Sequence, residues 1–458
     1  MKDSALAGAK RALSSALAAG SGDVEVSFAG RETHFVRFAS SRFTQVGRTE
    51  SLSMRIRVIA GDRLGTEVCA TLRPQAIDAA ARAAVELARM SPALDVPFSF
   101  AQKSAGDPRQ PGGAAARGSG IPDRLTAVEA PGELRSAFDG HAGVKFAGAL
   151  KTHRRFVGVV TAGELEKMAQ HAYYDLGVIA EDDGATGYAG ASGAVTREPD
   201  FADVCRRARD IAGRARDPIV VSPGAYDVVL APEAIAELFE WMAMASFGGN
   251  KVLEETSLLC GAGDAAICDP RLTIIDQVGD EEPAFDAEGV DRRRVALFEA
   301  GMAGEPMTDR LTAARLTKAD GRQRESTGHA PAVDSGSSDG PTISHLRMAP
   351  GQSTEADLIG SIERGIYVTR LHYVNGLLDT RRATTTGMTR DGAFLIQGGK
   401  LGRGIRNLRF TEHMLAALGR IGDIGDTTRD VPTWWSDAGV ISVPAVSLRE
   451  FHFTGQSR

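Results

Sequence analysis

The sequence has few aromatic residues and few cysteines. Phenylalanine, tryptophan and tyrosine together make up 6% of the 458 residues. The four cysteines, Cys69, Cys205, Cys260 and Cys268, contain no CxxC pair, and no close cysteine–histidine cluster has the spacing of a zinc site. We therefore expect four buried or half-buried free thiols in a reducing cytosol, and neither a disulfide framework nor a cysteine-based metal site.

Long apolar runs and an excess of basic charge are also absent. No apolar run reaches the roughly 18 residues that a membrane-spanning helix needs. Asp3 and Lys10 interrupt the N-terminal apolar stretch, so we expect no signal peptide. The 53 basic and 59 acidic side chains give a net charge of -6, which argues against broad nucleic-acid binding. These features predict a cytoplasmic globular protein without a membrane partner.

The order of the strand-like and helix-like segments predicts an α+β fold. We expect N-terminal antiparallel sheet meanders with helices, followed by a mostly antiparallel, β-rich C-terminal domain. The predicted units are residues 1–100 (a meander plus a helix), 101–123 (a Gly/Pro-rich loop), 124–216 (a second meander plus helix of the same body) and 217–458 (the β-rich domain).

The first two units show signs of an internal repeat. Val58-Ile59-Ala60, Asp62 and Thr66 recur as Val178-Ile179-Ala180, Asp182 and Thr186, at a constant offset of 120 residues. A helix-like segment follows each copy, at residues 74–90 and 201–215. The shared order of elements, more than the matched residues, favours a structural repeat.

Residues 366–418 form the stretch around which the C-terminal domain is organised. We expect turns at Asn375-Gly376 and Gly398-Gly399, because these residues tolerate positive φ. The strand candidates between them are Tyr367–Tyr373, Ala393–Gln397 and Gly402–Phe410, and Glu412–Leu418 is a helix candidate. The pattern predicts an antiparallel meander capped by a short helix.

Three segments of this domain carry a resemblance to a known family. They are GIYVTRL (residues 365–371), TTTGMTRDGAFLIQGGKL (residues 384–401) and VPAVSLREFHFTG (residues 443–455). Together they resemble the C-terminal region of the TldD/PmbA family, also called modulators of DNA gyrase. The family includes zinc peptidase subunits (TldD-like) and partner subunits without a metal site (PmbA- or TldE-like).

The residues in place of the metal motif decide between these two kinds of subunit. In TldD-like members a helix carries HExxxH, in which two histidines and a later cysteine hold zinc and the glutamate is the general base. At the matching place this sequence keeps Glu233, but Pro232 and Glu237 stand where the histidines would be. Proline has no donor atom on its side chain, and no cysteine follows Cys268. The resemblance therefore implies a PmbA/TldE-like subunit with no metal site and no cofactor.

Several other residues are candidates for catalysis or binding. Glu233 and Glu237 lie one helical turn apart and could act as acid and base, although a solvated helix face is the commoner meaning of such a pair. Arg381 and Arg382 could bind a peptide carboxylate, pair with acids across a subunit interface, or simply occupy an exposed turn. Five histidines lie in the last domain without ligand spacing: His329, His345, His372, His413 and His452.

The resemblance implies a function that depends on a partner. We expect a subunit that is not catalytic by itself and that assembles with a TldD-like zinc subunit, as a heterodimer or a higher oligomer. The complex would degrade unfolded or leader peptides, and this chain would build the chamber and hold extended substrate. Two alternatives remain open: a self-standing homodimeric scaffold or peptide-binding protein, and a hydrolase that uses Glu233 with a histidine from elsewhere. The gyrase role rests on the family name, and the acidic balance gives it no direct support.

Overall fold

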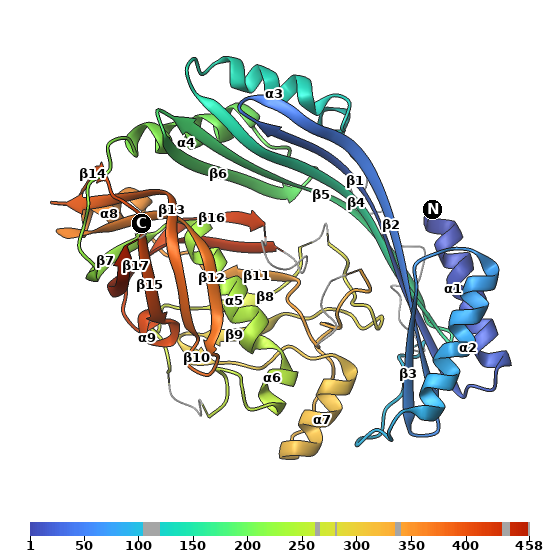
Figure 1. The fold of residues 1–458 in the computed structure, drawn as a ribbon. Helices are drawn as coiled ribbons and strands as arrows, with labels where there is room; N and C mark the ends of the chain where they lie inside the picture. Colours follow the sequence, from blue (N-terminus) through green and yellow to red (C-terminus); the bar gives the residue numbers. More distant parts are fainter. Residues whose placement is uncertain (104–119, 262–265, 280–281, 335–339, 433–439, 457–458) are drawn as a thin grey trace.

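A computed structural model describes residues 1–103, 120–261, 266–279, 282–334, 340–432 and 440–456. It contains two sheets, one of six strands and one of eleven. In Figure 1 the six-stranded sheet is long and curved, and it arches over the C-terminal half of the chain. Within the described ranges, no helix combines the length and apolar character that crossing a membrane would require.

The six-stranded sheet consists of two copies of one unit. Each copy runs helix, three strands, helix, and the strand order is β3-β2-β1-β4-β5-β6 with every neighbouring pair antiparallel. The element order confirms the predicted repeat. The first copy is α1 (Lys2–Ala18), β1 (Asp23–Ala39), β2 (Arg42–Ala60), β3 (Arg63–Cys69) and α2 (Pro74–Met90). The second, after a short turn of helix at Asp123–Leu125, is α3 (Ala130–Asp139), β4 (Lys145–Thr161), β5 (Glu166–Asp182), β6 (Ala185–Ala194) and α4 (Phe201–Arg214).

The two copies meet at the pair β1–β4. Strands β1 and β4 begin and end 122 residues apart, and β3 and β6 begin 122 residues apart, so equivalent positions of the two units are separated by 122 residues. The register of β1–β4 places Glu32 opposite Arg154, and these residues have that separation. They therefore occupy equivalent positions and face each other across a local two-fold axis. The neighbouring pairs Arg31–Arg155 and Thr33–His153 lie on either side of this axis.

The strands are longer than the sequence predicted. Val24–Phe28 and His34–Phe38 each have the length and composition of a short strand, but both are parts of the continuous 17-residue β1. Their side chains alternate between the two faces of the sheet. Val24, Val26 and Phe28 pack with α1 and α2 on the convex face, where α3 and α4 also lie farther along. The concave face is left to the other residues of each strand.

The C-terminal half folds around a mixed sheet. Most of its strand pairs are antiparallel, but β7–β12 and β11–β17 are parallel. Together with the first sheet, this confirms the predicted α+β class. The elements are β7 (Gly224–Leu230), α5 (Pro232–Met242), a wider π-type turn (Ala243–Phe247), α6 (Gly249–Leu253), β8 (Ile274–Asp276), β9 (Val295–Glu299), β10 (Met302–Ala303), α7 (Arg310–Asp320), β11 (His345–Met348), α8 (Glu355–Gly360), β12 (Arg364–Asp379), β13 (Thr384–Gln397), β14 (Lys400–Gly404), β15 (Leu408–His413), α9 (Met414–Leu418), β16 (Ile421–Pro432) and β17 (Val440–Gln456).

One predicted turn in this domain is wrong and the other is correct. Asn375-Gly376 lies inside β12, and the chain reverses later, at residues 380–383. A Cβ atom on Gly376 would lie 2.8 Å from Cβ of Trp241 on α5, so glycine serves close packing here. Gly398 and Gly399 have φ of 55° and 71° and make the predicted turn. The domain boundaries at residues 100, 123 and 216 stay a prediction, and residues 104–119 of the predicted loop lie outside the described ranges.

A buried ionic cluster ties the curved sheet to the C-terminal half. Nη2 of Arg57 on β2 lies 2.7 Å from Oε1 of Glu288, and its Nε donates to Oε1 of Glu25 on β1 at 2.9 Å. The side chains of Glu25 and Glu288 are 0% and 1% exposed. Arg57 therefore holds two carboxylates that water does not reach, one from each half of the molecule.

Candidate functional site

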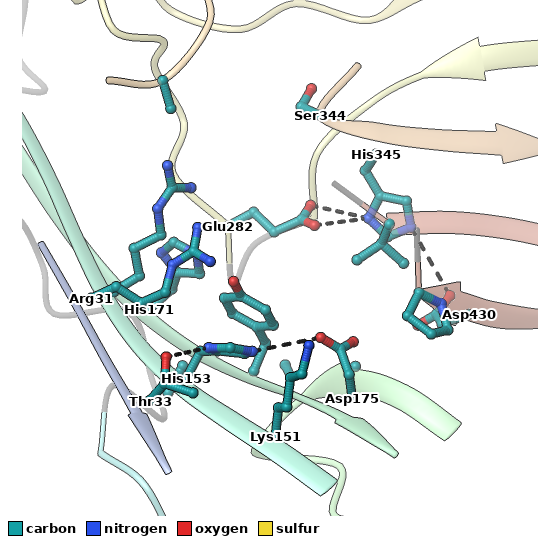
Figure 2. Close-up of a pocket in the computed structure, with 18 of the residues that line it drawn as sticks. Arg31, Thr33, Lys151, His153, His171, Asp175, Glu282, Ser344, His345 and Asp430 are labelled. Atoms are coloured by element: carbon teal, nitrogen blue, oxygen red, sulfur yellow. Dashed lines mark hydrogen bonds and ion pairs between the residues drawn. The ribbon is translucent and has the colours of Figure 1, made fainter. Parts of the chain in front are cut away.

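A cavity of about 1160 Å³ lies between the concave face of the curved sheet and the C-terminal domain. Strands β1, β4 and β5 form one wall. Loop residues between β8 and β9, residues that precede β11, and the facing ends of β16 and β17 form the other. Figure 2 shows Thr33, His153 and His171 on the sheet wall and Glu282, His345 and Asp430 on the opposite wall.

The strand register arranges the polar side chains of the sheet wall in rows. Arg31, Arg155 and His171 are consecutive partners across β1, β4 and β5, as are Thr33, His153 and Tyr173. Directly opposite residues in an antiparallel pair lie within reach of each other on the same face. The ring of Tyr173 stacks on His153 at 4.7 Å and on His171 at 5.6 Å between ring centroids. The wall is therefore a flat aromatic row with arginines beside it.

Arg31 and Arg155 together bind one carboxylate, that of Asp334. Nη2 of Arg31 lies 3.2 Å from Oδ2 of Asp334, Nε of Arg155 donates to the same oxygen at 3.0 Å, and Nη2 of Arg155 donates to Oδ1. The three side chains are 10–15% exposed. Burial alone would raise the pKa of Asp334, but Arg155 and Arg31 outweigh it and hold this pKa below its usual range.

The two histidines of the sheet wall are held neutral. Burial, followed by the charges of Arg31, Lys151 and Arg155, lowers the pKa of His153 to about 3. Burial, and Arg155 after it, lowers the pKa of His171 to about 3 as well. Nδ1 of His153 lies 2.8 Å from Oγ1 of Thr33, and Nε2 lies 3.7 Å from Oδ2 of Asp175. These rings offer hydrogen bonds to a ligand but carry no charge near pH 7.

On the opposite wall His345, Glu282 and Asp430 line the cavity, and Ser442, which is not a lining residue, connects His345 to Asp430. Nδ1 of His345 lies 3.0 Å from Oε1 of Glu282, and Nε2 lies 2.6 Å from Oγ of Ser442. The hydroxyl of Ser442 is also bonded to Asp430. A carboxylate only accepts, so Ser442 donates its single proton to Asp430 and accepts from His345. That direction is the reverse of the one that activates a nucleophile, so this group orders the wall and provides no activated serine.

Among the described residues that line the cavity, basic side chains outnumber acidic ones. The acidic ones are Asp175, Glu282, Asp286 and Asp430, and the basic ones are Arg31, Arg37, Lys151, Arg155, Arg197, Arg292 and Arg347. Two of these arginines, Arg31 and Arg155, are already paired with Asp334. The described wall therefore presents guanidinium groups of the kind that bind carboxylates.

Glu233, the retained glutamate of the sequence motif, lies outside this cavity wall. It is in the first turn of α5, where its side chain is 11% exposed. Nη1 of Arg207 on α4 lies 3.8 Å from Oε1 of Glu233, and Nη1 of Arg429 on β16 lies 3.5 Å from Oε2. The carboxylate is thus bound by two guanidinium groups and joins α4 to the C-terminal domain.

The residues around Glu233 do not fit a zinc ion. Pro232 has no donor atom, and the two nearby guanidinium groups carry the same sign of charge as the metal. Glu237 is buried on the same helix, 5% exposed. Over the ranges that the structure describes, no three His, Cys, Asp or Glu side chains are placed to hold a metal ion.

Arg381 and Arg382 lie far along the β12–β13 hairpin, in the turn between the two strands. Both are exposed, and Nε of Arg382 lies 3.8 Å from Oδ2 of Asp379. Neither residue belongs to the cavity wall. The structure does not bring these residues together with Glu233 or with the cavity, and their role in substrate binding stays a prediction.

Comparisons with known proteins match both halves of the chain. A family model described as the PmbA/TldA metallopeptidase C-terminal domain matches residues 223–455, which is just over half of the chain. A second, described as PmbA/TldA metallopeptidase domain 1, matches residues 24–88. Metalloprotease TldD homologues of Haemophilus influenzae and of Buchnera aphidicola subsp. Schizaphis graminum are each 27% identical, over 216 and 215 residues. These alignments cover 46% of this chain and 40% of each relative, so the chain matches less than half the length of these curated relatives.

Solved structures share the fold over almost the whole chain. TldE from Thermococcus kodakarensis has a TM-score of 0.82 at 17% identity and covers 98% of this chain and 100% of its own. A putative modulator of a DNA gyrase from Thermotoga maritima has a TM-score of 0.78 at 16% identity, covering 97% and 99%. One from Bacteroides thetaiotaomicron has a TM-score of 0.74 at 18% identity, covering 98% of both chains. The resemblance in the three C-terminal segments is thereby confirmed, and the chain belongs to the PmbA/TldD family of metallopeptidase-related proteins.

Proposed function

We propose that this chain is a metal-free, PmbA/TldE-like subunit of a cytoplasmic peptidase complex and that its catalytic partner is a TldD-like zinc subunit. The observation that carries the proposal is the environment of Glu233. The motif glutamate is kept, but Arg207 and Arg429 bind it, and Pro232 and Glu237 replace the two histidines. In this setting the carboxylate acts as an ion-pair partner between α4 and α5 and not as a base beside a metal.

The cavity supports a role in holding substrate. It is large enough for several residues of a peptide, and its walls offer charged and neutral hydrogen-bonding groups together. In such a complex this chain would contribute chamber surface and substrate contacts, and the zinc subunit would supply the metal that activates water for peptide hydrolysis.

Metal analysis of the purified chain, run beside a peptidase assay, tests the proposal. We expect no stoichiometric zinc and no cleavage of an unfolded protein by the chain alone. We expect cleavage when an HExxxH-bearing homologue from the same genome is co-purified with it. One zinc per chain, or cleavage by the chain alone, would contradict the proposal. A stable homodimer that never binds the homologue would favour the scaffold alternative.

A substitution at Glu233 separates an ion-pair role from a catalytic role. With Glu233→Gln we expect the peptidase activity of the mixed complex to stay within about twofold, because the general base lies in the partner. The matched control is the same substitution at the glutamate of the partner's HExxxH motif, which should lower the rate by roughly 100-fold or more. If Glu233→Gln lowered the rate as much as the control does, Glu233 would be part of the catalytic machinery.

A further inference from the structure

A segment of the C-terminal domain forms part of the cavity wall and presents a carboxylate to the curved sheet. The backbone N–H of Ala330 donates to Oδ2 of Asp286 at 2.9 Å, and the carbonyl of Pro331 accepts from Nη1 of Arg55 at 3.4 Å. Ala332 and Val333 line the cavity, and Asp334 follows with its carboxylate on Arg31 and Arg155. Residues 330–334 thus form part of the cavity wall, and the acidic end of this segment is bound by two arginines.

The arginines hold this carboxylate in the geometry that recognises free carboxylates. Arg155 uses two nitrogens on the two oxygens of Asp334, and Arg31 adds a third contact. Such fork-to-fork pairs give both strength and orientation, which is why arginine serves where carboxylates must be selected. The site lies in the partly open cavity, so a ligand from solution has access to the same surface.

One polar atom beside Arg155 has no partner of its own. Nδ1 of His171 is buried in the cavity wall and makes no hydrogen bond within the described residues. His171 is 8% exposed and lies opposite Arg155 on β5. A buried polar atom without a partner is costly and points to a group that completes it. A bound ligand beside Arg155 would supply that group.

We propose that Arg31 and Arg155 form a carboxylate-binding site for acidic peptides and that Asp334 is an internal occupant which a substrate displaces. The inference rests on the proposed function, because it names the class of peptide that the chamber holds. The tethered Asp334 has an effective concentration of roughly millimolar order, so it competes well with a dilute peptide. Removing it exposes the site.

The test uses the full-length chain and a defined probe. The probe is the peptide Ala-Pro-Ala-Val-Asp, labelled with fluorescein at its N-terminus, and its counterpart is Ala-Pro-Ala-Val-Asn with an amidated end. We expect Asp334→Ala to bind the probe at least roughly tenfold more tightly than the unsubstituted chain does. We expect the Asp334→Ala variant to bind the probe roughly tenfold or more tightly than the counterpart, because an amide cannot form the charged hydrogen bonds that a carboxylate forms with arginine.

Two arginine variants test the location. Adding Arg155→Gln to Asp334→Ala should weaken probe binding roughly tenfold or more. Adding Arg154→Gln should leave it unchanged, because Arg154 pairs with Glu32 on the other face of the sheet while the change in net charge is the same. Equal binding of both peptides, equal losses in both arginine variants, or displacement of the probe by an equal concentration of acetate would overturn the inference.

Folding and function are controlled separately. If Asp334→Ala fails to fold, Asp334→Asn replaces it, because asparagine keeps the size of the side chain. Probe binding by Asp334→Asn is then compared with binding by the double variant Asp334→Asn, Arg155→Gln, which has lost one charge of each sign. All binding is measured without the partner. If the chain does not select the acidic probe but still supports peptidase activity with its partner, only the carboxylate site is contradicted. If it selects the acidic probe but supports no such activity, only the proposed function is contradicted.

Discussion

Replacing Arg57 by methionine is expected to destabilise the chain by about 3–5 kcal/mol, the usual cost of removing one partner from a buried ion pair. Arg57 is 11% exposed and bridges Glu25 and Glu288, whose side chains have almost no contact with water. Methionine keeps the apolar stem beside the ring of Phe100, whose centroid lies 5.2 Å from the guanidinium carbon. The loss is therefore one of charge more than of packing. The loss of stability is measured as the shift of the urea unfolding midpoint between the variant and the unsubstituted chain.

Two further variants show whether the charge is responsible. Arg48→Met changes the same side chain on the same strand, but Arg48 is 51% exposed, and its pairs with Glu32 and Glu50 should contribute at most about 1 kcal/mol. Combining Arg57→Met with Glu25→Gln and Glu288→Gln removes the two stranded charges and should recover part of the stability. A loss for Arg57→Met no larger than that for Arg48→Met would mean that the cluster does not join the two halves.

The histidines of the cavity wall should make the chain lose stability as pH falls below about 6.5. Their pKa values are about 3 in the folded state, against 6.5 for an ordinary histidine. Between these values the unfolded chain binds more protons, so the contribution is complete above pH 6.5 and is lost as pH falls toward 3. From pH 7 to pH 5 each histidine should cost about 2 kcal/mol of unfolding free energy.

The free energy of unfolding is measured at pH 7 and pH 5 for the unsubstituted chain and for the double variant His153→Gln, His171→Gln, and the difference between the two proteins is compared. The difference is needed because Asp286 acts in the opposite direction. Burial, with Glu288 after it, raises the pKa of Asp286 to about 7, so its contribution to stability grows as pH falls through that value. The exposed His413 on β15 provides the matched control, His413→Gln. Equal pH dependence with and without the two histidines would show that the imidazoles are protonated in the folded chain.

The sequence predicted the order of the elements better than their extent. The repeat followed from the shared order of elements more than from the residue matches at an offset of 120, since the strands themselves correspond at an offset of 122. The helices at residues 74–90 and 201–215 were placed to within a residue. The lengths of β1 and β2 were missed because a strand of 17 or 19 residues contains polar stretches that look like breaks. In α1 the leucines Leu6, Leu13 and Leu17 are half-buried or exposed, and the small residues Ala5, Ala9, Ala12 and Ala16 face the protein, because α1 packs closely on α2 and the sheet.

The cavity could not be predicted from the sequence. Arg31, Arg155 and His171 come together through the register of three strands, and Asp334 joins them from 179 residues beyond Arg155. One local signal was available: Lys151, His153 and Arg155 alternate along β4, which indicates a polar face on a central strand. By contrast, the replacement of two histidines by Pro232 and Glu237 could be recognised from the sequence, because the HExxxH motif fixes the positions of the histidines relative to Glu233. The pairing of Glu233 with Arg207 and Arg429 required the fold.

The two-fold axis between the repeats has a consequence for how they can diverge. The pair Arg31–Arg155 lies on one side of this axis and the pair Thr33–His153 on the other, so two identical units would make the two pairs alike. A cavity floor built in that way could not distinguish one end of a bound chain from the other. Here one pair has two guanidinium groups and the other has a hydroxyl and a neutral imidazole, which gives the floor of the cavity a direction. A peptide has two unlike ends, and a floor that has lost its symmetry is able to tell them apart.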